Sequence, residues 1–241
     1  MPTIQDRGFV ISIKKYNDRS KIIKIFSENN GIISGFLKNK HTKAEKYKDQ
    51  VGNYVGFGCE VKNVDGYGNV ETQSIEDFLN IFFINKLYLL LFNSAISILN
   101  NILIKNDVVD EIYKIFYNLM FCFKENNKNI LLNYVDFLYN IVEYTGISIN
   151  VDSCDLDNNE VFYISPKTGN GISKELGEKY KNQLFTVPRC FVGFDNNIEE
   201  IIKAVNILHY FIYKFCKENN VIKKYEPIRF FKTEIIKYLK K

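Results

Sequence analysis

Tryptophan is absent from the 241-residue sequence, proline occurs four times and histidine only twice. Neither histidine belongs to a recognisable catalytic arrangement: His41 lies in a lysine-rich segment, and His209 lies in an apolar stretch where a packed or hydrogen-bonded imidazole is the usual role. The pair Gly56-x-Gly58 is not followed by the helix that a phosphate-binding turn requires. We therefore expect no enzymatic activity, and a nuclease or ligase has little support.

The five cysteines are far apart, with no pair at the spacing of a metal knuckle or a disulfide framework. They are Cys59, Cys122, Cys154, Cys190 and Cys216. This pattern favours a reducing compartment, so we expect a cytoplasmic protein without a cofactor. Charges from Arg7 onward interrupt any signal-peptide core. The apolar run at 78–92 is broken by Asn80, Asn85 and Lys86 into pieces too short to span a membrane, and it predicts a buried helix.

Acidic residues are scarce at both ends of the chain, although the net charge is only +4. Residues 1–48 carry a net +7 and residues 214–241 a net +6, whereas the residues between them carry −9. Two basic ends that flank an acidic middle indicate surfaces for polyanions or acidic partners.

The first seventy-odd residues have the alternation and the turns of short strands. The stretches FVISIKKY, KIIKIF and GIISGFL predict a three-strand meander, and two further strands are expected around 55–61 and 69–74. A longer basic connection follows the third strand. Five strands with that connection fit a small barrel of the OB type.

A helical period replaces the alternation after residue 74. Ser74 and Asp77 resemble a capping box, which predicts a helix that buries Leu89 among other apolar residues. Further helices are expected at about 107–123, 129–144 and 198–217, with Gly146 ending the second of these. The segment at about 150–190 is rich in Asp, Asn and Gly and predicts an irregular inserted lobe. The fold class is therefore α+β.

Several segments in register resemble the bacterial recombination-mediator family RecO. They are DRGFVISIKKYNDRSKIIKIFSENNGIISGFLKNK, GNYVGF, EYTG followed by Cys154, and YISPKTGNGIS. The resemblance implies an OB-fold domain at 1–76 and an all-helical domain at 77–241 with an inserted lobe. It also implies a non-catalytic role: binding single- and double-stranded DNA, annealing complementary strands and, with RecR, helping to load RecA onto strands covered by the single-strand binding protein.

The sequence departs from this family at two places. Many members carry a four-cysteine zinc ribbon in the lobe, whereas this chain keeps Cys154 but has Asp157, Ser173 and Leu176 at the other positions. One thiolate cannot make a structural zinc site, so we expect a zinc-ribbon-like lobe without metal. The other departure is Tyr134-Val135-Asp136, where the family often shows Arg-Phe-Glu.

The predicted DNA-binding surface combines the first hairpin with the basic connection after the third strand. Its members are Lys14, Lys15, Arg19, Lys21, Lys38, Lys40, Lys43, Lys46 and Lys48. Basic side chains of an OB barrel follow phosphates while aromatic rings stack on bases, and Tyr16, Phe36 and Tyr47 are the candidates for stacking. A core position is the alternative for Phe36, and a solvated linker is the alternative for the connection.

A second set of basic residues near the carboxyl end is accompanied by aromatic residues. These are Lys214, Lys217, Lys223, Lys224 and Arg229. The resemblance makes the acidic tail of the single-strand binding protein their candidate partner. Lysines that complement helix dipoles are the alternative, and direct DNA contact is a third.

The predicted function is that of a DNA-binding recombination mediator, cytoplasmic and associated with the nucleoid when bound to DNA. Two other classes stay open. One is a docking scaffold that recruits repair proteins with little DNA binding of its own. The other is an RNA-binding OB protein, which competition between RNA and DNA oligomers would distinguish.

Overall fold

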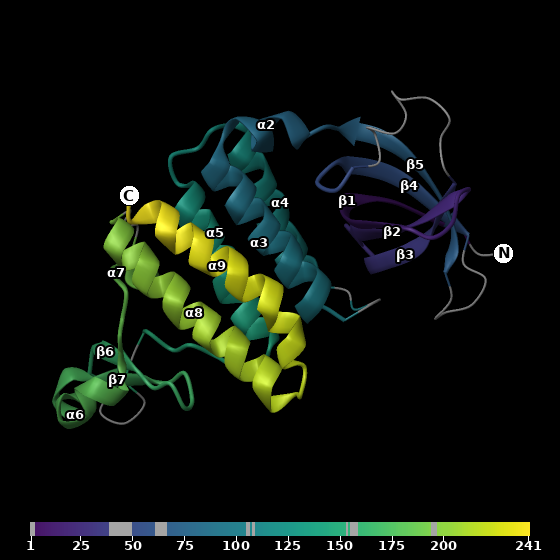
Figure 1. The fold of residues 1–241 in the computed structure, drawn as a ribbon. Coiled ribbons are helices and arrows are strands. Elements are labelled where there is room, and N and C mark those ends of the chain that lie inside the picture. The colour runs from purple at the N-terminus through teal and green to yellow at the C-terminus, as the bar shows by residue number, and fades with distance from the viewer. Residues whose placement is uncertain are drawn as a thin grey trace. The chain divides into compact units, whose positions relative to one another are not determined.

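The computed structural model describes residues 3–38, 50–60, 67–104, 107, 109–152, 154, 159–193 and 197–241 (Figure 1). The chain folds as two compact units, Met1–Met120 and Phe121–Lys241. The predicted domain boundary at 76/77 falls at the end of the last barrel strand, inside the first unit, and stays a prediction.

The first unit begins with five strands that form a closed barrel. They are β1 (Thr3–Lys15), β2 (Ser20–Ser27), β3 (Gly31–Lys38), β4 (Tyr54–Glu60) and β5 (Gly68–Glu76). Their order around the barrel is β1-β2-β3-β5-β4, with β3 and β5 parallel and the other neighbours antiparallel. This is the five-stranded Greek-key barrel of the OB fold, so the predicted architecture is confirmed.

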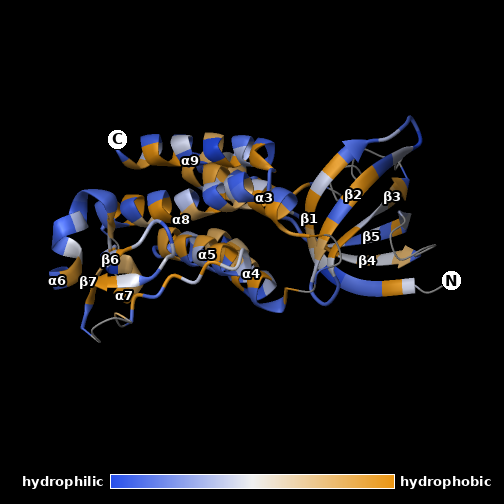
Figure 2. Cartoon of the chain, turned by 90° about the horizontal axis from the view of Figure 1, so that it is seen from below, coloured by the Kyte–Doolittle hydropathy of each residue, from blue (hydrophilic) through white to orange (hydrophobic). Residues whose placement is uncertain are grey.

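Hydrophobic and hydrophilic residues change places along the strands of the barrel (Figure 2). Ile23 and Ile25 of β2 point inward together with Ile33 and Leu37 of β3, and all four are buried in one cluster. Because successive side chains of a strand point to opposite faces, the residues between them face outward. The meander therefore presents a second, outward row of side chains.

One end of this outward row is covered by an aromatic cluster within the first unit. Phe9 and Phe26 are fully buried, and their rings lie 5.3 and 6.0 Å from the ring of Phe116 on α4 (Asp110–Lys124). Tyr113 lies 5.2 Å from Phe26. Edge-on aromatic pairs of this kind bury a large apolar area and add directional contacts. The helix thereby covers this end of the barrel face.

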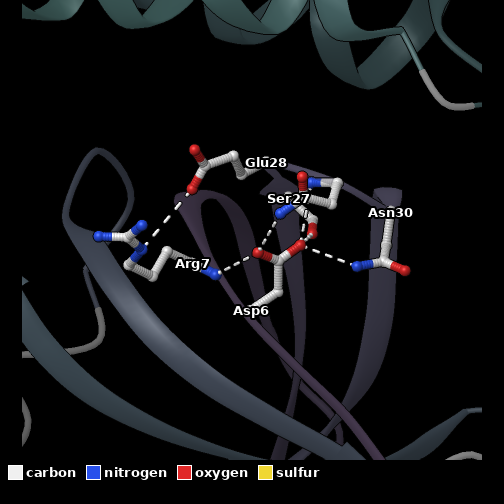
Figure 3. Close-up of polar contacts among 6 residues, drawn as sticks. Asp6, Arg7, Ser27, Glu28 and Asn30 are labelled. Atoms are coloured by element: carbon white, nitrogen blue, oxygen red, sulfur yellow. Dashed lines mark hydrogen bonds and ion pairs between the residues drawn. The ribbon is translucent and has the colours of Figure 1, made fainter.

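The carboxylate of Asp6 ties β1 to the turn between β2 and β3 (Figure 3). It accepts hydrogen bonds from the Ser27 hydroxyl, from the Asn29 backbone at 2.9 Å and from the Asn30 amide at 2.8 Å. Burial opposes the ionised form, but these hydrogen bonds and one from the Arg7 backbone outweigh it and lower the pKa of Asp6. The Asp6 network therefore holds the turn in place while the carboxylate is charged.

The helical part of the first unit differs from the prediction. Ser74 pairs with Val55 inside β5, so it does not cap a helix, and the expected single helix is split into α2 (Leu79–Ile84) and α3 (Lys86–Ile102). The split occurs at Asn85, whose side chain accepts from the backbone of the first turn of α3. Leu89, predicted in the core, is 36% exposed. A strong N-cap inside the apolar run thus starts a new helix.

The second unit contains three long helices and a small lobe. The helices are α5 (Ile130–Tyr144), α8 (Ile198–Glu218) and α9 (Tyr225–Leu239), with the short η2 (Ile222–Lys224) before α9. The predicted helices at 107–123, 129–144 and 198–217 are confirmed by α4, α5 and α8, and Gly146, with a positive φ of 82°, follows the end of α5. The predictions include no counterpart of α9.

Fully buried His209 sits in the interior of α8, which packs against α9 (Figure 1). Its ring lies 6.3 Å from the ring of Tyr225, and neither ring nitrogen has a hydrogen-bond partner among the described residues. Burial, and to a smaller extent the charge of Lys232, lowers the pKa of His209 to about 3. The expected packed imidazole is confirmed, and it is neutral.

The lobe between α5 and α8 is more regular than its composition predicts. Its sheet has the order β7-β6-β8. The elements are β6 (Val161–Ile164), β7 (Gly171–Ser173), α6 (Lys174–Gly177), η1 (Glu178–Gln183), β8 (Phe185–Thr186) and α7 (Arg189–Val192). Among the helices of the described residues, none combines the length and the apolar character needed to cross a bilayer.

Candidate functional site

The other end of the outward barrel row combines lysines with an aromatic ring. Lys14 of β1 pairs in register with Ile22 of β2, and Ile22 pairs with Phe36 of β3. Two positions further toward the strand ends, Ser20 pairs with Lys38. Since Leu37 points into the barrel, Phe36 and Lys38 on either side of it face outward. Neighbouring strands thus bring residues from separate parts of the sequence onto one surface.

Three aromatic rings form a continuous ladder across this surface. The ring of Phe36 lies 4.9 Å from the ring of Tyr16 and 5.4 Å from the ring of Tyr67. Tyr16 and Tyr67 are 58% and 46% exposed, and Phe36 is partly buried between them. The alternative that Phe36 belongs to the core is therefore wrong, because its strand position points outward. We call Tyr16, Phe36 and Tyr67 the aromatic ladder.

The cations of the first hairpin lie at the ends of the same strands. Lys14 is the last residue but one of β1, Arg19 lies in the β1–β2 turn, and Lys21 is the second residue of β2, where it pairs with Leu37. Lys15 forms an ion pair with Asp18: the Lys15 ammonium lies 2.7 Å from the Asp18 carboxylate, and both side chains are largely exposed. In the part of the chain that the structure describes, no carboxylate forms an ion pair with Lys14, Arg19, Lys21 or Lys38. These four charges are available to a polyanion.

Part of the predicted surface lies outside the described residues. This applies to Lys40, Lys43, Lys46 and Lys48, and also to Tyr47 and His41. Their contribution stays a prediction.

Sequence reasoning missed two residues of this surface. Lys24 pairs with Ser34 and shares the outward side of β2 with Ile22, a position that counting alternate residues from the apolar pattern could have found. Tyr67 lies between two glycines in Gly66-Tyr67-Gly68, and the sequence reads that stretch only as a turn. Tyr67 lies next to Phe36 because β3 pairs with β5 in parallel, and this pairing cannot be predicted from the sequence.

The basic residues predicted to bind a partner lie on two segments of the second unit. Lys214 and Lys217 belong to α8, Lys223 and Lys224 to η2, and Arg229 to α9. Lys214 differs from the others because its ammonium donates a hydrogen bond to the backbone carbonyl of Lys167 in the lobe. The others are exposed and follow one another around the α8–α9 connection. The structure thus gathers four cations and directs the fifth toward the lobe.

The residues at the lobe positions that carry cysteine in zinc-bearing relatives do not fit a zinc ion. The Ser173 hydroxyl accepts a hydrogen bond from the backbone of Leu176, so it caps α6 as an N-cap. Leu176 offers no ligand atom, and Asp157 lies outside the described residues. Among the described residues, no group of three or more His, Cys, Asp or Glu side chains could hold a metal. The position that would begin a second metal knuckle is therefore used to cap a helix.

Comparison with known proteins agrees with the fold. Residues 1–78 match the family model described as recombination protein O N terminal. The chain is 28% identical over 223 residues to the DNA repair protein RecO of Rickettsia canadensis (strain McKiel), covering 90% of each chain. It is 27% identical to that of Rickettsia felis and 28% identical to that of Rickettsia typhi, covering 90% of this chain and 92% of each relative. With its amino-terminal domain matched and nine-tenths of its length aligned, the chain is similar to the DNA repair protein RecO.

Proposed function

We propose that the chain is a non-catalytic, DNA-binding mediator of recombinational repair. It binds single- and double-stranded DNA, anneals complementary strands and, with RecR, helps to load RecA onto strands covered by the single-strand binding protein. The observation that carries the proposal is the aromatic ladder with its unpaired cations on the outer face of an OB barrel. The similarity to the DNA repair protein RecO supports the DNA-repair role.

A single strand fits this surface by two kinds of contact. Exposed bases stack on the rings of the ladder, and such stacking tolerates any sequence because every base has an aromatic face. Phosphates approach Lys14, Arg19, Lys21 and Lys38, and each contact releases counterions, so binding weakens steeply with salt. Neither kind of contact reads base edges, and sequence preference is therefore weak. Annealing needs this combination, because it holds strands without choosing among them.

The cations around the α8–α9 connection serve the partner interaction in this proposal. Lys217, Lys223, Lys224 and Arg229, with Lys214, bind the acidic tail of the single-strand binding protein. Phe230 is 59% exposed on α9 and lies 5.3 Å from the Phe231 ring, which gives an apolar contact beside the cations. The protein works in the cytoplasm, at the nucleoid when DNA is bound.

The test is fluorescence anisotropy of labelled single-stranded DNA across a salt series. The first variant changes Lys14, Lys21 and Lys38 to Gln, and the second changes Lys38, Lys40, Lys43, Lys46 and Lys48 to Gln. The matched control changes three exposed lysines away from the barrel face to Gln: Lys86, Lys114 and Lys128. At about 0.7 per phosphate contact on a single strand, the first variant should flatten the slope of log affinity against log salt by up to about 2.

The outcomes separate the candidates. Lower affinity and a flatter slope in the first variant but not in the control support DNA binding on the barrel face, and the second variant tests the basic connection. Equal slopes in all proteins would move the DNA site away from this surface. No binding by the unmodified protein would contradict the proposal and favour the docking scaffold, and preference for an RNA oligomer of the same sequence would favour the RNA-binding class.

A further inference from the structure

A cavity of about 460 Å³ opens on the lobe of the second unit, far along the chain from the barrel. Its walls come from the turn after β6, from α6, from η1 and from the middle of α8. The residues that matter for its chemistry are Lys167, Leu176, Tyr180, Gln183, Tyr210 and Lys214.

Aromatic side chains around this cavity are exposed to an unusual degree for their size. Tyr180 is 58% exposed and Tyr210 is 39% exposed. Tyr210 is oriented by the edge-on ring of Phe185, whose centre lies 5.1 Å away. Aromatic rings held at the surface beside cations are the elements of a stacking platform.

Positive charge dominates the mouth of the cavity. The Lys214 ammonium donates to the Lys167 carbonyl, which joins α8 to the turn after β6 and holds a cation in the cavity wall. Glu218 lies 3.9 Å from Lys214 as a weak counter-charge. The nearest acid on η1, Glu178, is engaged by Lys181 at 2.8 Å and by the Tyr163 hydroxyl at 3.1 Å. None of the described carboxylates pairs with Lys167.

The polar groups in the lining distinguish a nucleic acid from an acidic peptide. A carboxylate needs only donors, whereas the edge of a base needs donors and acceptors side by side. The Gln183 amide and the hydroxyls of Tyr180 and Tyr210 supply both. Leu176 adds an apolar surface on which a base can lie.

We propose that this lobe surface is a second binding site for single-stranded DNA, separate from the barrel face. The inference rests on the proposed function, because annealing requires two strands to be held at once. The barrel face then holds one strand and the lobe holds the other. The phosphates of the lobe strand approach Lys167 and Lys214, and its bases stack on Tyr180 and Tyr210.

The experiment measures how many oligothymidylate molecules of fifteen nucleotides one chain binds, by titration at low salt and saturating concentration. The lobe variant carries Tyr180→Ala and Lys167→Gln, both at exposed positions, and Lys167→Gln alone is a milder second variant. The barrel variant carries Lys14, Lys21 and Lys38 changed to Gln, and Lys86, Lys114 and Lys128 changed to Gln form the control. Circular dichroism establishes that each variant is folded.

We expect two oligomers per chain for the unmodified protein and the control, one for either single-site variant and none for the combination. The affinity of the barrel variant should fall by about tenfold or more when the lobe changes are added, the effect of losing one stacked base. Two oligomers bound by the lobe variant, or one by the unmodified protein and none by the barrel variant, would overturn the lobe site while the proposed function stands.

Failure of the proposed function looks different, because then the unmodified protein binds no oligomer. A labelled acidic peptide that ends in phenylalanine tests the other class of ligand. If the lobe changes weaken binding of that peptide and leave the oligomer count at two, the cavity is a peptide site and the inference is wrong.

Discussion

The ring of Tyr16, just after β1, lies 4.9 Å from the ring of Phe36 near the end of β3. The contact exists because the meander places the ends of β1 and β3 on either side of β2. Neither ring is needed to fill the barrel, whose interior is occupied by the aliphatic side chains of the opposite strand face. Two adjacent rings on the outward barrel surface are thus free to serve as a stacking platform.

Replacing Phe36 by Ala should weaken single-stranded DNA binding by about 1–3 kcal/mol, the usual effect of losing one stacked base. The salt slope should not change, since no cation is removed. Anisotropy titrations at several salt concentrations measure both quantities. Phe36→Leu keeps apolar bulk without an aromatic face and should lose most of the same affinity, whereas Ile84→Ala, at a position 87% exposed on α2, should lose none. Unchanged affinity of Phe36→Ala would exclude the ladder from binding.

Replacing Asp6 by Asn should lower the free energy of unfolding by about 1 kcal/mol at pH 7, because charged hydrogen bonds to the β2–β3 turn are lost and partial exposure reduces their worth. The pKa of Asp6 lies below the ordinary value of 3.8 for an aspartate. Its contribution is therefore complete above that value and is lost as the pH falls through the lower folded pKa.

Urea unfolding at pH 7, 5 and 3 tests this expectation. The difference in free energy of unfolding between the unmodified protein and Asp6→Asn should decrease only at the lowest pH. Asp18→Asn is the control, because Asp18 is 94% exposed, forms a surface ion pair with Lys15 and should change stability little. A gap that is constant at all three pH values would show that the charge of Asp6 plays no part.

Replacing His209 by Leu should stabilise the protein in mild acid. The folded pKa of about 3 lies below the ordinary histidine pKa of 6.5, so the neutral imidazole contributes stability that is lost as the pH falls below about 6.5. At pH 5.5 the difference amounts to about 1 kcal/mol. Thermal unfolding at pH 7.5 and 5.5 should show similar stability at the higher pH and an advantage for the variant at the lower one. If the stability of His209→Leu relative to the unmodified protein does not increase as the pH falls, the assignment of a buried neutral imidazole is wrong.

Treatment with a chelator should leave thermal unfolding unchanged, and elemental analysis should find no stoichiometric zinc, because capping by Ser173 replaces a metal knuckle in the lobe. Ser173→Ala should instead destabilise the lobe by about 1 kcal/mol, the usual cost of a lost N-cap. Hydrogen exchange of the Leu176 amide reports this locally. Ser165→Ala, at a turn hydroxyl that accepts only a long 3.3 Å hydrogen bond from Lys167, serves as the control. A fall in melting temperature on chelation would show that the lobe binds a metal and would contradict the prediction.

The barrel could be predicted from the sequence because alternation, turns and a basic connection specify it locally. The pairing register could not, and it decides which side of β3 carries Phe36. The sequence also does not reveal how a cap competes with an apolar run: Asn85 starts a new helix inside a stretch that reads as one. Ser74 illustrates the reverse case, since a residue suited to capping was taken up by the pairing of β5 with β4. Long-range pairing overrides local preference at Ser74, whereas at Asn85 one local preference overrides another.

The parallel pairing of β3 with β5 has a consequence for how the protein is made. Gly35 lies opposite Gly68, and a Cβ at Gly35 would come within 2.6 Å of the Gly68 carbonyl oxygen. The two strands can therefore pair this closely only because position 35 has no side chain. A chain still on the ribosome and synthesised only as far as β4 has no partner for this edge of β3. Unpaired strand edges promote association between chains. The interval between synthesis of β3 and of β5 is therefore when the nascent chain most needs a chaperone.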